Sequence, residues 1–77
     1  MQEKKFIEIG ARIKELREEK NWTQTVLASK VRVTTTFIAA LEKGVYKPAN
    51  PMLIALSNVF HVPMIDIDPD VDIDLKE

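Results

Sequence analysis

The feature that most limits the fold of this chain is a pair of helix-start signals placed close together in its middle. Thr23 and Thr34 each stand where a threonine hydroxyl accepts a hydrogen bond from the free N–H groups of a helix's first turn. Each is flanked by the apolar pair of a hydrophobic staple, Trp22 with Leu27 and Val33 with Ile38. We therefore predict a helix over residues 24–31, a very tight turn, and a second short helix that Gly44 closes.

Helical signals continue on both sides of this pair. Apolar residues recur at helical spacing over residues 6–16, which predicts an amphipathic first helix. Asn50 followed by Pro51 is typical of the cap and first residue of a fourth helix, and Pro63 opens a fifth, shorter one. With 77 residues the chain has room for one domain, and we expect an all-α fold. The predicted core faces are Phe6, Ile9, Ile13 and Leu16 in the first helix and Leu53, Leu56, Ser57 and Phe60 in the fourth.

Charge is distributed unevenly along the chain, although the formal net charge is only −1. Residues 20–50 hold five basic residues and one acidic residue, a local balance of +4. Residues 63–77 hold six acidic residues against Lys76, a balance of −5. A partner responds to the local field and not to the average, so the basic middle remains compatible with a polyanion.

The reactive side chains needed for catalysis or metal binding are scarce. The chain has no cysteine, and His61 is its single histidine, without a second ligand at zinc-site spacing. One histidine also leaves little scope for general acid–base chemistry, so we expect no enzyme, metal site or cofactor. No apolar run approaches the ~18 residues of a membrane span, and no signal-peptide segment opens the chain, so we expect no membrane partner and a cytoplasmic protein.

A short helix, a tight turn and a second short helix form a helix-turn-helix, and the residues carry a closer resemblance. In order and without gaps, the chain contains IGARIKELREEKNWTQ, VLASKVRVT, FIAALEKG, the proline of VYKP, and MLIALSNVFHV. It resembles the Xre-type family of phage repressor and Cro-like proteins over about residues 7–67. The resemblance implies a five-helix, lambda-repressor-like DNA-binding domain whose third helix lies in the major groove while the second crosses above it.

The resemblance also implies roles for single residues. The family glutamine that matches Gln24 clamps a DNA phosphate, and the free N–H groups and dipole of a helix start favour an anion there. The plainer alternative is that Gln24 is only a good first-turn residue. Arg17 and Glu42 match a family pair that joins the first helix to the end of the third as a partly buried ion pair, so we expect them to be structural.

The face of the third helix that remains outside the core is small and smooth. Threonine bonds several bases and, like alanine, can touch a thymine methyl, whereas bidentate reading of guanine or adenine needs longer side chains. We hypothesise shape-dependent or methyl-dependent, AT-tolerant recognition of modest specificity, with Lys43 and Lys47 on phosphates. The alternative is that Thr35 and Thr36 are only polar surface and that this copy of the fold no longer reads DNA. The candidate DNA-binding residues are Thr23, Gln24, Thr34, Thr35, Thr36, Ala39, Ala40, Lys43 and Lys47.

Two departures from the family pattern bear on this prediction. The turn between the second and third helices usually carries glycine where this chain has Arg32, at a position that tends to need a positive φ. Arginine there is strained, or the turn is reshaped. Ala39 and Ala40 stand where relatives commonly carry longer polar side chains, which weakens base-specific reading but not the fold.

The chain ends in an acidic segment, and we place a domain boundary between residues 1–68 and a tail over residues 69–77. From Ile65 onward apolar residues occupy odd positions and aspartates even ones, interrupted by Pro69. Such alternation favours a strand, but a lone strand on a helical domain needs a partner. Three interpretations remain open: a disordered acidic tail, a β-arm that completes a homodimer, and a docking strand for another protein.

The sequence thus predicts a bacterial or phage-type DNA-binding transcription regulator that acts as a dimer on two half-sites about one helical turn apart. Symmetry favours the dimer, because one interface of this size rarely supplies enough affinity. The alternative from another class is a protein-interaction module on the same fold, such as the antitoxin of a toxin pair, with weak or lost DNA binding.

Overall fold

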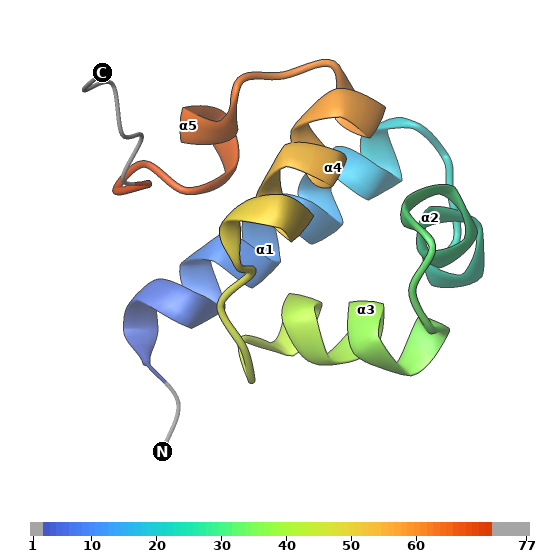
Figure 1. The fold of residues 1–77 in the computed structure, drawn as a ribbon. Helices are drawn as coiled ribbons and strands as arrows, with labels where there is room; N and C mark the ends of the chain where they lie inside the picture. The colour runs from blue at the N-terminus through green and yellow to red at the C-terminus, as the bar shows by residue number, and fades with distance from the viewer. Residues whose placement is uncertain (1–2, 72–77) are drawn as a thin grey trace.

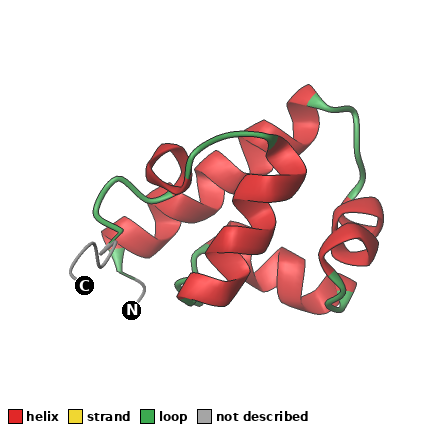
Figure 2. Cartoon of the chain, turned by 45° about the horizontal axis from the view of Figure 1, so that its top comes forward, coloured by secondary structure: helices red, strands yellow, loops and turns green. Residues whose placement is uncertain are grey.

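Five α-helices follow one another in the computed structural model, which describes residues 3–71, and no strand occurs within that range (Figure 1, Figure 2). Figure 1 shows α3 crossing below the centre of the molecule, with α2 beside its start and α5 on the far side of α4. The predicted five-helix, all-α fold is confirmed. The helices are α1 (Lys4–Glu19), α2 (Gln24–Val31), α3 (Thr35–Lys43), α4 (Asn50–Phe60) and α5 (Met64–Ile67).

Every helix contributes side chains to one apolar core. The predicted face of α4 is buried as a whole, and that of α1 is buried from Ile9 onward, while Phe6 is only half-buried. Burial of these side chains removes apolar surface from water, which is the main favourable term in folding a domain of this size. The core consists of Ile9, Ile13, Leu16, Leu27, Ala28, Ile38, Leu41, Leu53, Leu56, Phe60 and Ile67.

The backbones of α1 and α3 meet at Gly10. A Cβ atom added to Gly10 would overlap the carbonyl oxygens of Leu41 and Glu42 in α3. Only a residue without a side chain allows this approach, so the glycine that weakens α1 as an isolated helix is required by its packing. The position of α3 is therefore fixed by direct backbone contact with α1.

Both predicted threonine caps are present. The backbone N–H of Val26 donates to Thr23 Oγ1 at 3.1 Å, and that of Phe37 donates to Thr34 Oγ1 at 3.0 Å. Gly44 ends α3 with φ +83°, in the left-handed conformation expected of it. The predicted bounds of α2 agree with the structure residue for residue.

The predicted start of α4 is wrong by one position. Ala49 occupies the cap, Asn50 is the first helical residue, and no side chain caps the helix. Proline fits at the second position as well as at the first, because the first four N–H groups of a helix have no partner within it. The Asn50–Pro51 pair therefore does not determine by itself which residue is the first of the helix.

The alternating segment at the end of the chain begins as a helix. Ile65 and Ile67 both lie in α5, so alternation there does not mark a strand. The next residues turn back onto the domain: Lys5 Nζ lies 3.3 Å from Asp70 Oδ2, and Val71 packs against the core. Residues 72–77, on which most of the predicted tail or arm falls, lie outside the described part of the chain.

Arg32, which follows α2, has φ +64° and ψ +45°, so the left-handed geometry is kept without glycine. This conformation costs a side chain roughly 1–2 kcal/mol. We expect Arg32→Gly to raise the free energy of unfolding by about 1 kcal/mol, measured by urea titration with circular dichroism. Asn21→Gly, at φ +60°, is the control and should gain less because asparagine tolerates this region. Clear destabilisation by Arg32→Gly would contradict the strain.

Candidate nucleic-acid interface

A turn of three residues, Arg32 to Thr34, carries the chain from α2 to α3. The amides that follow α2 bond back to it, with Val33 N–H donating to the Ala28 carbonyl at 3.0 Å. Thr34 then caps α3, so hydrogen bonds constrain the turn at both of its ends. The resulting unit places α2 beside the start of α3 (Figure 1), with Thr25 of its first turn 3.3 Å from Thr35 between hydroxyl oxygens.

The outer face of α3 is built from the predicted residues. Thr34, Thr35, Thr36 and Lys43 are exposed, whereas Ile38 and Leu41 are buried in the core. Ala39 and Ala40 are half-buried, so their methyl groups form the floor of this face and not its projections. We call this surface of α3 the reading face; it consists of Thr34, Thr35, Thr36, Ala39, Ala40 and Lys43.

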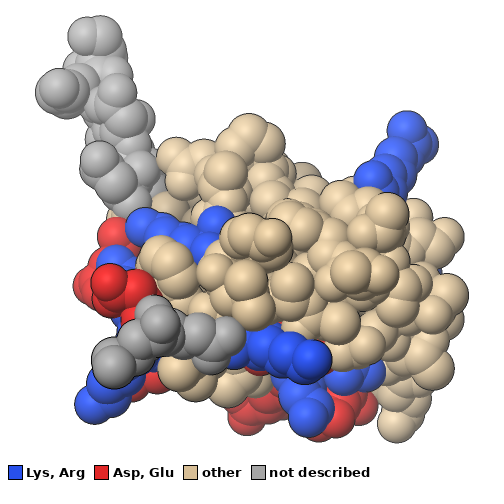
Figure 3. Space-filling view, turned by 90° about the horizontal axis from the view of Figure 1, so that it is seen from below, with Lys and Arg blue, Asp and Glu red and all other residues tan. Residues whose placement is uncertain are grey.

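The reading face is nearly free of charge and has basic groups around it. Figure 3, seen from the side on which α3 lies, shows a broad uncharged area with Lys and Arg at its margins and acidic groups gathered at its edges. The half-buried Phe37 of α3 stacks on Tyr46 of the following loop with ring centroids 5.9 Å apart, and Tyr46 is 51% exposed. Such a surface can approach base edges in its centre and phosphates at its rim.

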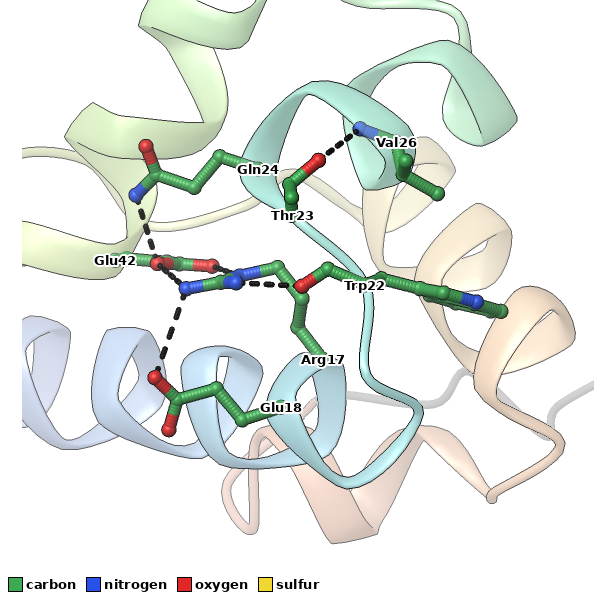
Figure 4. A network of polar contacts seen from close by, with 7 residues as sticks. All are labelled: Arg17, Glu18, Trp22, Thr23, Gln24, Val26 and Glu42. Atoms are coloured by element: carbon green, nitrogen blue, oxygen red, sulfur yellow. Dashed lines mark hydrogen bonds and ion pairs between the residues drawn. The ribbon is translucent and has the colours of Figure 1, made fainter.

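The predicted ion pair between α1 and α3 is confirmed and is well buried (Figure 4). Arg17 Nε donates to Glu42 Oε2 at 2.6 Å and its Nη2 donates to Oε1 at 3.1 Å, with side chains 10% and 4% exposed. Arg17 Nη1 also donates to the Trp22 carbonyl at 2.7 Å, which ties down the segment before α2. This one guanidinium therefore joins three parts of the domain.

The hydrogen bond with Glu42 raises the pKa of Arg17, and the charges of Glu42 and Glu18 add to this effect while burial opposes it. A group whose pKa is raised on folding stabilises the fold at all pH values below its unfolded pKa. For an arginine this covers the whole physiological range, so the pair holds α3 without acting as a pH switch.

Gln24 joins the same network. Its Nε2 donates to Glu42 Oε1 at 2.9 Å, and the side chain is half-buried (Figure 4). An amide nitrogen has two hydrogens, so one remains for another acceptor. The predicted phosphate contact of Gln24 thus stays a prediction, but the structure gives the residue an internal role that its position in the sequence did not reveal.

Thr25 was not among the predicted residues, yet it touches the reading face. Thr35 Oγ1 donates to Thr25 Oγ1 at 3.3 Å, and both threonines are exposed. No signal in the sequence predicted this contact, although Thr25 directly follows Gln24 in the first turn of α2, where an anion is favoured.

Lys47, in the loop after α3, is already engaged by a carboxylate. Its Nζ lies 3.9 Å from Asp68 Oδ2, and Asp68 is fully buried. Asp68 Oδ1 accepts from the Asp70 N–H, whereas Oδ2 has no hydrogen-bond partner among residues 3–71. The Lys47 side chain is 42% exposed, so it is partly accessible to a phosphate although it lies beside Asp68.

The described residues hold little else that could serve as a site. Within residues 3–71 no three His, Cys, Asp or Glu side chains are grouped as a metal would need. A hollow of about 140 Å³ lies between α1 and α5, lined in part by Lys5, Arg12 and Asp66. Ligand pockets usually measure about 300–1,000 Å³. No helix in the described range is long and apolar enough to cross a bilayer.

Comparison with known proteins gives matches in family and in fold. The pattern of the Helix-turn-helix family, which includes the Xre and Cro/C1 types, matches residues 13–67. No curated protein matches the chain in sequence.

Several solved structures are similar to this chain. SinR, a master regulator for biofilm formation in Bacillus subtilis that was solved in complex with DNA, is 32% identical; the match covers 73% of this chain and 90% of that one, with a TM-score of 0.68. The restriction-modification controller protein C.AhdI of Aeromonas hydrophila is 19% identical over 80% of this chain and 94% of its own, with a TM-score of 0.76. The clp gene regulator ClgR of Corynebacterium glutamicum is 21% identical over 87% and 71%, with a TM-score of 0.78.

Removal of Arg17 tests how far the fold depends on the buried pair. In Arg17→Met the Glu42 carboxylate, 4% exposed, stays buried without its counter-charge, so we expect a loss of roughly 3–5 kcal/mol in the free energy of unfolding. Urea titration with circular dichroism measures this. Lys14→Met, at an exposed site on α1, is the matched control and should change stability by about 0.5 kcal/mol at most. A loss of less than about 1 kcal/mol in Arg17→Met would place the pair among ordinary surface pairs.

Proposed function

We propose that this chain is a transcriptional regulator that inserts α3 into the major groove of double-stranded DNA. The chain belongs to the Helix-turn-helix family, in its Xre or Cro/C1-type form, and is a DNA-binding regulator and not an enzyme. The observation that carries the proposal is the reading face: exposed hydroxyls and shallow methyl groups on α3, next to a fixed α2. An α-helix fits the major groove, where each base pair presents a distinct pattern of donors, acceptors and methyl groups.

Phosphate contacts would come from the residues around the reading face. Thr23 and Thr34 each use an oxygen lone pair for a helix cap, which leaves the hydroxyl hydrogen for a phosphate. Gln24 has one free amide hydrogen beside the positive end of the α2 dipole. Lys43 is exposed at the end of α3, and Lys47 follows in the next loop. These groups fix orientation on the duplex and carry no sequence information themselves.

Base reading would be modest in specificity. Ala39 and Ala40 can touch thymine methyl groups, and Thr35 and Thr36 can make single hydrogen bonds. The reading face holds no Arg, Asn or Gln for a bidentate contact, and its lysine stands at one end. Preference among sites then depends also on DNA shape.

We propose further that the chain works in the cytoplasm as a homodimer on two half-sites separated by about one turn of DNA, ~34 Å. Two linked contacts add affinity that one small domain does not provide alone. This arrangement makes a palindromic operator the expected target.

Substitution of the two lysines tests the phosphate contacts. We expect Lys43→Ala and Lys47→Ala to weaken binding to all duplexes alike, and Lys43→Ala to lower the slope of log K against log salt by about 1. The change for Lys47→Ala should be smaller, because Asp68 already compensates part of its charge. Thr36→Val is the contrasting variant: it should alter base preference and leave the slope unchanged. Salt-independent affinity, or a large shift of sequence preference in Lys47→Ala, would contradict these roles.

The dimer is tested by mass in solution, with and without an operator-like duplex. We expect two chains per duplex that carries two half-sites. Removal of residues 72–77 then identifies the role of the tail: loss of the dimer would show that the tail is the pairing arm, and an unchanged dimer would exclude that role. One chain per duplex at saturating protein concentration would contradict the dimer itself.

A further inference from the structure

The three consecutive threonines at the start of α3 do not have equal freedom. Thr34 accepts the Phe37 N–H, and Thr35 is bonded to Thr25 of α2, whereas no side-chain bond engages Thr36 within the described residues. The Thr25–Thr35 contact joins the start of α2, which crosses the DNA backbone in the proposed complex, to the start of the helix that reads bases. It thus connects a phosphate-facing position with a base-facing one.

The single hydrogen of each hydroxyl sets the polarity of this pair. A hydroxyl donates once and accepts twice. A phosphate oxygen only accepts, so Thr25 must donate its hydrogen to a phosphate that binds at the positive end of the α2 dipole. Thr25 is then left to accept the Thr35 hydrogen, and the two hydroxyl oxygens already lie 3.3 Å apart in the free protein. The Thr35 hydroxyl, whose hydrogen is already donated, can then only accept a hydrogen bond from a base in the groove.

We propose that Thr25 and Thr35 act as an oriented hydroxyl pair that selects a base with an amino group, adenine or cytosine, at one position of each half-site. In the major groove only adenine N6 and cytosine N4 present hydrogen-bond donors, whereas guanine O6 and thymine O4 accept. The inference rests on the proposed function and deepens it. A lone threonine hydroxyl can donate to a base or accept from one, whereas in this pair Thr35 can only accept. The inference also assigns a specificity role to Thr25.

The test is selection from randomised duplexes, followed by titration of duplexes that differ at the one selected position. On one strand of each half-site, the wild-type chain should prefer adenine or cytosine at that position over guanine or thymine by roughly tenfold. Thr25→Val keeps the shape but removes the internal acceptor, so the Thr35 hydrogen is freed and discrimination against guanine and thymine should fall to about twofold or less. Thr25→Ser, which keeps the hydroxyl, should retain the preference. Thr36→Val should change a different position.

The outcomes separate this inference from the function on which it rests. Both threonines are exposed, and urea titration of each variant verifies that the fold is kept. If duplexes bind with the expected salt dependence but Thr25→Val keeps the wild-type preference, or no position accepts both adenine and cytosine on one strand while rejecting guanine and thymine there, the hydroxyl pair is overturned while the function stands. If no duplex binds with salt-dependent affinity, both proposals are overturned.

Discussion

The buried contact between Arg17 and Glu42 is the interaction on which the arrangement of the reading helix depends. It joins the last turn of α1 to the last turn of α3, and the same guanidinium holds the backbone before α2 through Trp22. Gln24 adds α2 to the carboxylate. Because a charge inside the domain needs both its partner and its hydrogen bonds, the three helices are coupled through one site. A binding surface made of short helices gains its rigidity from this polar centre as well as from the apolar core.

Local features of this structure follow from the sequence because neighbouring residues decide them. The caps at Thr23 and Thr34 need only the N–H groups three residues further on, and Gly44 and Arg32 mark helix ends through their own backbone angles. The ion pair was predicted by resemblance and not by local rules. The start of α4 was placed one residue late. Proline fits at the first or the second position of a helix, so the sequence does not show whether Ala49 or Asn50 is the cap residue.

Contacts between distant segments were not predictable in the same way. The Thr25–Thr35 bond depends on how α2 crosses α3, and the engagement of Lys47 by Asp68 depends on where the segment after α5 returns to the domain. Charge counting treated Lys47 as a free cation of the basic middle. Its buried neighbour belongs to the acidic end of the chain, so the two ends of the charge pattern meet in space and partly cancel.

The backbone contact at Gly10 has a consequence for how such a protein chooses among sites. Since α1 and α3 touch at Gly10 without intervening side chains, and protein interiors resist compression, α3 has little room to move relative to α1 in the proposed complex with DNA. In that complex we expect the nucleic acid to supply the adjustment, and base steps that kink easily differ from stiff tracts in what that adjustment costs. Discrimination then includes the elastic properties of segments that no side chain touches.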